Sequence, residues 1–147
     1  MWYDLLIEFP NLRAEFSVER SKRDFFYNCI AFAASETHRI WWPSPVNKAY
    51  WPAGVPRERT LDAFKAAYAT LGFEGCDGGE LEQGYEKIAI YALRAKPTHA
   101  AKQLPNGHWA SKIGREEDIE HETVSGVTGD NYGEVAVYLK RRIQSPD

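Results

Sequence analysis

The strongest constraint on the fold comes from the second half of the chain, where two strand-like runs flank a tight turn. Residues 98–104 and 108–113 lie on either side of Pro105, Asn106 and Gly107. An Asn-Gly pair between two such runs is a strong signal for a β-hairpin, because both residues tolerate the positive φ that tight hairpin turns require. The sequence therefore predicts an antiparallel sheet in this half of the chain.

Two further segments are typical of strands in the same sheet. Residues 87–92 form a short, nearly continuous apolar run, and residues 134–140 alternate between apolar and polar side chains. Because helix-like segments precede these strands, we expect an α+β fold with N-terminal helices packed on a small antiparallel β-sheet. At 147 residues the chain is expected to form one domain, 1–147, in which residues 1–20 are an N-terminal extension.

The residue that begins the first helix decides how Cys29 is placed. A helix capped by Ser21, which has capping-box spacing with Asp24, would bury Cys29 in its middle. A helix capped by Asn28 would place Cys29 in the first turn, where backbone N–H groups stabilise a thiolate. The aromatic residues 25–27 suit an exposed helix interior poorly, so the sequence favours Asn28.

A second helix is predicted to begin after Thr60, a candidate N-cap, and to end near Gly72. Its apolar residues recur at helical spacing and would share one face: Leu61, Phe64, Ala67, Tyr68 and Leu71. We interpret this face as part of the core.

Cys29 and His99 are the residues most suggestive of chemistry. A cysteine at a helix start and a histidine on a later strand are the minimum for thiolate catalysis, since the imidazole can hold the sulfur charged and then protonate the leaving group. The alternative is a buried structural cysteine, because a free cysteine packs as a small apolar side chain. A third possibility is a thiol-based redox role, for which Cys76 would have to lie close to Cys29.

The register of the predicted hairpin selects a third candidate residue. If the loop has three residues, Leu104 faces His108, and His99 and Ser111 lie on the same face as diagonal neighbours. A loop of two residues would instead bring Ala110 and Lys112 to the face of His99. In the first register, Ser111 could orient the imidazole of His99.

Together, Asn28-Cys29 before an alanine-rich helix, His99 on a strand and a polar residue on the return strand resemble the papain-like cysteine hydrolases, in particular the compact NlpC-type amidases and peptidases. This resemblance implies a papain-like fold and a hydrolase of amide bonds, with Cys29 as nucleophile and Ser111 in the orienting position. NlpC-type enzymes usually carry Asp-Cys followed by Ser or Gly, and their orienting residue is usually His, Asn or Gln. Asp118, Glu120 or His121 could replace Ser111 in that role, and Asp118 would be the strongest electrostatic partner.

Four segments also resemble an uncharacterised bacterial domain family over roughly residues 28–140: residues 28–31, 50–56, 111–114 and 118–121. This second resemblance implies no activity.

Further residues would complete a hydrolase site. The backbone N–H of Cys29 would stabilise the oxyanion, and the side chain of Asn28 could contribute, although we expect it to cap the helix. Residues 38–57 form a loop rich in proline and aromatic residues, in which Trp41, Trp42 and Trp51 are expected either to line a substrate groove or to cover the core. The expected partner is a peptide or small amide substrate, with a protein partner as a further option.

Composition argues against several other classes. The net charge of −3 and pI near 5.8 give no reason to expect nucleic acid, and no apolar run approaches the length of a membrane span. No signal peptide, zinc spacing or phosphate-binding loop is visible, so we expect a cytoplasmic protein without metal or cofactor. The alternative to a hydrolase is a non-catalytic binding or immunity-type module with the same fold.

Overall fold

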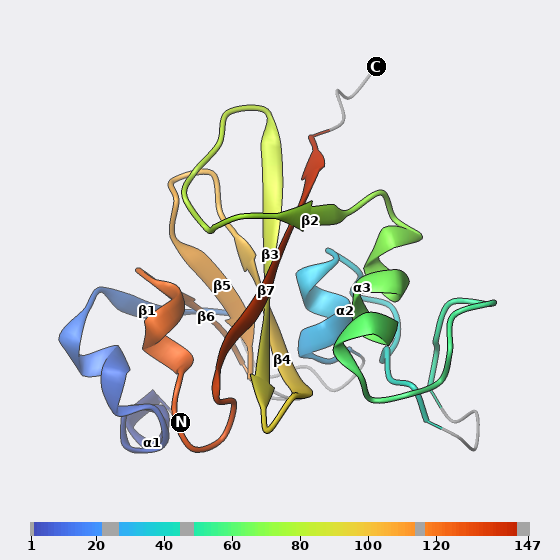
Figure 1. Cartoon of the computed structure of the whole chain (residues 1–147). Helices are drawn as coiled ribbons and strands as arrows, with labels where there is room; N and C mark the ends of the chain where they lie inside the picture. The colour runs from blue at the N-terminus through green and yellow to red at the C-terminus, as the bar shows by residue number, and fades with distance from the viewer. Residues whose placement is uncertain (1, 22–26, 45–48, 114–116, 144–147) are drawn as a thin grey trace.

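The computed structural model describes residues 2–21, 27–44, 49–113 and 117–143, and its centre is one seven-stranded antiparallel sheet (Figure 1). The strand order is β1-β6-β5-β4-β3-β7-β2. The strands are β1 (Ser17–Ser21), β2 (Glu74–Cys76), β3 (Tyr85–Leu93), β4 (Lys96–Gln103), β5 (Trp109–Lys112), β6 (Asp118–His121) and β7 (Glu134–Arg142).

The described helices are short and lie on both faces of this sheet. They are the α-helices α1 (Trp2–Glu8), α2 (Cys29–Ala33) and α3 (Leu61–Ala69), and the 3-10 helices η1 (Pro10–Ala14) and η2 (Val124–Val127). In Figure 1, α2 and α3 lie on one side of the sheet, and α1 lies on the other. The longest described helix has nine residues, so none of the described helices could span a bilayer.

This architecture corrects the expected papain-like α+β fold with N-terminal helices on a small sheet. The sheet has seven strands and dominates the domain, whereas α2 and α3 have only five and nine residues. Three of the strands, β1, β2 and β6, have three to five residues each and pair across long stretches of sequence, as Ser17 with His121 and Cys76 with Tyr138 show. Such short, non-local pairs leave little periodic signal in the sequence, because tertiary contacts rather than local pattern form them.

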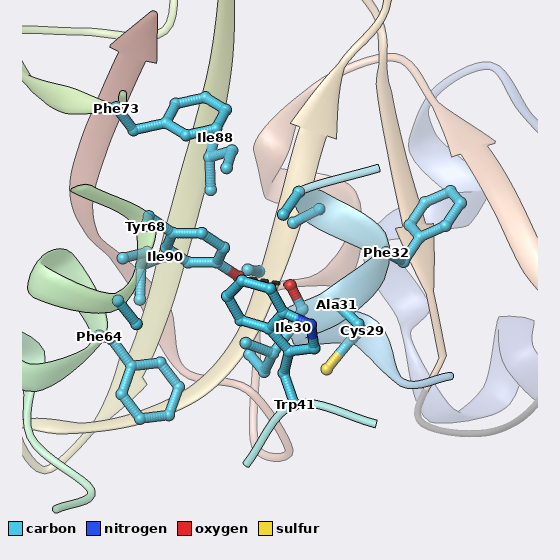
Figure 2. Close-up of a cluster of buried hydrophobic side chains, with 14 of the residues drawn as sticks. Cys29, Ile30, Ala31, Phe32, Trp41, Phe64, Tyr68, Phe73, Ile88 and Ile90 are labelled. Atoms are coloured by element: carbon cyan, nitrogen blue, oxygen red, sulfur yellow. Dashed lines mark hydrogen bonds between the residues drawn. The ribbon is translucent and has the colours of Figure 1, made fainter. Parts of the chain in front are cut away.

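Alternation along the strands gives the sheet two separate apolar layers. On β3, Ile88 and Ile90 belong to a cluster with α2 and α3, whereas Ala89 and Tyr91 belong to a cluster with η1 and η2. We call these two sides the α2–α3 face and the η1–η2 face. Figure 2 shows the first cluster, in which the Tyr68 hydroxyl donates a hydrogen bond of 2.7 Å to the carbonyl oxygen of Ile30.

The local predictions for the second helix are confirmed. The Thr60 hydroxyl accepts a 3.1 Å hydrogen bond from the backbone N–H of Ala63 and caps α3. Phe64 and Tyr68 are fully buried on the α2–α3 face. Gly72 follows the helix with φ of +94°, a conformation that glycine adopts without a steric penalty.

The hairpin also has the register expected for a three-residue loop. Lys102 pairs with Ala110, and Gln103 pairs with Trp109. Leu104 N–H donates a 2.7 Å hydrogen bond to His108 carbonyl, which closes the turn. This register places His99 and Ser111 on one face.

Candidate functional site

Asn28 is the N-cap of α2, as the aromatic pattern before it indicated. Its Oδ1 accepts hydrogen bonds from the backbone N–H groups of Ala31 at 3.2 Å and Trp41 at 3.1 Å, and its Nδ2 donates to the Trp41 carbonyl at 2.8 Å. Asn28 thus caps the helix and fixes the main chain of the aromatic loop. These three bonds engage both ends of the side-chain amide, so the geometry gives no support to an oxyanion role.

Cys29 lies inside the α2–α3 face, with only 6% of its surface exposed. Burial raises the pKa of its thiol to about 11, because the apolar surroundings disfavour the charged thiolate. The backbone amides of Ala100, Cys29 and Ile30 and the charge of Lys112 act in the opposite direction without offsetting this effect. The thiol is therefore protonated at neutral pH, and solvent has little access to it.

His99 lies on the other face of the sheet. Its ring stacks on that of Tyr132, with centroids 4.1 Å apart and planes 1° from parallel, and it contacts Tyr91 at 5.2 Å. Tyr91 and Tyr132 belong to the η1–η2 cluster, whereas Cys29 packs with Ala100, the residue after His99 on β4. Because successive side chains of a strand point to opposite faces, the sheet separates the thiol from the imidazole.

Ser111 joins His99 to a second histidine. The Ser111 hydroxyl lies 3.0 Å from Nε2 of His99 and 2.8 Å from Nε2 of His121, and Nδ1 of His121 lies 2.7 Å from the Thr123 carbonyl oxygen. The side chains of His99, Ser111 and His121 are fully buried. The structure therefore brings together Ser111 and two of the predicted residues, in a chain of hydrogen bonds without Cys29.

The chemistry of the acceptors determines which atom carries each proton in this series of hydrogen bonds. The Thr123 carbonyl can only accept, so Nδ1 of His121 carries a proton and its Nε2 accepts one from the Ser111 hydroxyl. The Ser111 oxygen then accepts from Nε2–H of His99. Nδ1 of His99 is left as a buried acceptor without a hydrogen-bond partner among the described residues.

Burial keeps both imidazoles neutral. Burial lowers the pKa of His121 to about 4. It also lowers the pKa of His99 well below its ordinary value, and the nearby imidazole of His121 acts in the same direction because two adjacent rings cannot easily both be charged. The two neutral rings are joined through one hydroxyl within an apolar layer, and of their four ring nitrogens only Nδ1 of His99 has no partner among the described residues. This arrangement resembles a structural network more than a site open to a substrate.

The carboxylates proposed as substitutes for Ser111 lie on the opposite face from His99. Asp118 is paired across the strands with Lys112 and forms an ion pair of 3.3 Å with Arg20. Glu120 accepts from His108 at 2.6 Å. Of the substitutes, only His121 contacts the Ser111 hydroxyl among the described hydrogen bonds.

The aromatic loop covers one end of the core. Trp41 and Trp51 are 2% and 4% exposed. Trp51 and Trp42 both contact the ring of Phe64, with centroid distances of 5.2 and 5.7 Å. The buried position of Trp41 and Trp51 supports the core-covering interpretation of this loop over a substrate groove.

The sequence offered no motif for a cavity with a volume of about 600 Å³. It lies where the segment before β3, the end of β4 and the end of β7 meet, and we call it the hairpin-end cavity. Its lining consists of Leu81, Glu82, Gln83, Gly84, Tyr85, Glu86, Gln103, Leu104, Pro105 and Ile143. Leu81, in the loop before β3, and Ile143, directly after β7, are exposed apolar residues of this lining, and the sequence alone does not show their exposure. Among the described residues, no group of three or more His, Cys, Asp or Glu side chains could hold a metal ion.

These features define a β-sheet domain with short helices on both faces, a sealed polar network and an open apolar cavity. The family described as a domain of unknown function, DUF7689, matches residues 18–140. This match spans most of the chain, so the chain belongs to the DUF7689 family. Comparison with curated proteins gives no match, and comparison with solved structures gives none either.

Proposed function

We propose that this domain is a non-catalytic binding module whose ligand site is the hairpin-end cavity. The observation that supports it best is the separation of Cys29 and His99 on opposite faces of the sheet, both buried. A cysteine hydrolase needs a thiol and an imidazole within hydrogen-bond reach of one another and of the substrate carbonyl. The geometry gives the hydrolase hypothesis no such pair.

The hairpin-end cavity has the properties of a small-molecule site. Its volume of about 600 Å³ falls within the usual range for ligand pockets. Its lining combines apolar side chains, among them Leu81, Leu104 and Ile143, with a few polar groups. Leu81 and Ile143 are 53% and 54% exposed, so a bound molecule would remove apolar surface from water.

We include a cytoplasmic location in this proposal. Cys29 and Cys76 are both free thiols. A reducing compartment maintains cysteines in this state, whereas oxidising compartments favour disulfides.

A neutral fluorophore tests the proposed site. Phenylnaphthylamine is apolar and brightens when it leaves water, so we expect saturable fluorescence with the wild-type domain. Leu81→Lys places a charge in the cavity and should weaken binding at least fivefold. Ile7→Lys is the matched control, because Ile7 is 60% exposed on α1 and does not line the cavity.

Two results would overturn the proposal. The first is a lack of saturable binding by the wild-type domain. The second is equal weakening by Leu81→Lys and Ile7→Lys, which would mean that the fluorophore binds elsewhere.

A further inference from the structure

We infer that the hairpin-end cavity selects a small, neutral, largely apolar molecule that carries an N–H or O–H donor, and that Oε1 of Gln103 accepts this donor. The inference rests on the proposed function, because it assigns a ligand class to the same cavity. Three observations support the inference: the hydrogen bonding of Gln103, the charge balance of the cavity lining and the apolar side chains of that lining.

Gln103 is the last residue of β4 and is 9% exposed. Its Nε2 donates a 2.7 Å hydrogen bond to the Gly79 carbonyl, which fixes the orientation of the amide. Its Oε1 is buried and has no hydrogen-bond partner among the described residues. Buried side-chain acceptors are rarely left without a partner. Gln103 lines the cavity, so a bound molecule that displaces the side chains covering Oε1 would complete it with its donor.

The charged residues of the lining are balanced by cations of the protein itself. Glu82 pairs with Lys140 at 2.9 Å and with Lys87 at 3.6 Å. Glu86 pairs with Arg141. Because these carboxylates already have cationic partners, the cavity offers little net charge to a ligand. This balance favours a neutral molecule over an ion.

Apolar side chains supply most of the remaining surface. They are Leu81, Tyr85, Leu104, Pro105 and Ile143. A planar ring with one donor would bury its faces against these side chains and direct the donor toward Gln103. Aromatic heterocycles with one N–H group have this combination of properties.

A second space also borders Gln103. A small void of about 20 Å³, lined by Ala33, Phe73 and Lys102 among others, has room for one water molecule. A water there would satisfy Oε1 without any ligand. The inference therefore depends on whether binding responds to the ligand's donor.

Two isomers of methylindole make this comparison without a change in size or apolar area. Skatole carries its methyl group on a ring carbon and keeps the N–H, whereas N-methylindole has lost it. We expect skatole to bind the wild-type domain about fivefold more tightly in an NMR titration, the usual contribution of one neutral hydrogen bond. In Gln103→Met the preference should disappear, and in Ile7→Lys it should remain.

Equal affinity of the two isomers for the wild-type domain would overturn the inference, and so would a preference that persists in Gln103→Met. The wild-type comparison is sufficient by itself if Gln103→Met does not fold. Failure of the inference is distinguishable from failure of the proposed function. If both isomers bind equally and Leu81→Lys weakens both, the cavity is a binding site without the donor selection inferred here. If neither isomer nor phenylnaphthylamine binds, the proposed function fails as well.

Discussion

Cys29 and His99 lie on opposite faces of one antiparallel sheet, the thiol in the first turn of α2 on the α2–α3 face and the imidazole stacked on Tyr132. The backbone of β4 runs between them, since His99 and Ala100 are consecutive residues that face opposite layers. Each residue has a structural role where it lies. Cys29 fills the apolar core, and His99 ends a chain of hydrogen bonds through Ser111 and His121.

The Asn28 side chain should be one of the larger contributors to stability. Asn28→Ala removes three hydrogen bonds and leaves the backbone groups of Ala31 and Trp41 without partners in a buried region. We expect the free energy of unfolding to fall by about 3 kcal/mol in urea titrations. Thr60→Ala, which removes a single cap bond of α3, should cost only about 1 kcal/mol. Equal losses in the two variants would contradict the double role of Asn28.

The two buried histidines should be different tautomers. His121 carries its proton on Nδ1, because the Thr123 carbonyl can only accept, and His99 carries its proton on Nε2. Nitrogen chemical shifts of the imidazole rings at neutral pH distinguish the two forms. Identical tautomers in both rings would contradict the order of donors and acceptors through Ser111.

Local features of the sequence predicted local structure well. The Asn28 cap, the Thr60 cap and the hairpin each depend on a few neighbouring residues. Both caps occur as expected, and the hairpin has the three-residue loop, one of the two registers that the sequence left open. The hairpin register also brought Ser111 to His99. These features are predictable because the interactions that form them lie within a few residues of the chain.

The layer in which each side chain lies could not be predicted in the same way. Whether Cys29 and His99 meet depends on which face of β4 is covered by α2, and this is set by contacts between distant segments. The register shift on β3 between Tyr91 and Ala92 also changes which residues share a face. Strands β1 and β6, which pair Ser17 with His121, are too short to show an alternating pattern.

Stability should fall as the pH falls from about 6.5 to about 4. Burial lowers the pKa of His121 from 6.5 to about 4 and also lowers that of His99 well below 6.5, so the unfolded chain binds protons first. The free energy of unfolding should therefore decrease with decreasing pH across this window, by about 1 kcal/mol per pH unit for each histidine. Urea titrations at several pH values measure it.

His121→Gln provides the control for this pH dependence. A glutamine can still bond to Ser111 but does not titrate, so the slope between pH 6.5 and pH 5 should decrease. A slope that is the same in His121→Gln as in the wild type would exclude His121 as its source.

Gly133 should be intolerant of a side chain. It has φ of +74°, and a Cβ atom there would collide with the carbonyl oxygen of Ala92. It also follows Tyr132, whose ring lies on His99. We expect Gly133→Ala to cost about 3 kcal/mol or more, whereas Gly54→Ala, with φ of +83° and open space around it, should cost only about 1 kcal/mol. Similar melting temperatures for the two variants would contradict the close contact at Gly133.

The most direct test of the central claim is the alkylation of the two cysteines in the folded protein. With iodoacetamide at neutral pH, we expect the partly exposed Cys76 to be labelled first and Cys29 to be protected, since its thiol is buried and its pKa is raised to about 11. Urea should increase the labelling of Cys29, and His99→Ala should not slow it. Faster labelling of Cys29 than of Cys76, with a rate that falls in His99→Ala, would show a thiolate–imidazole pair and contradict this account.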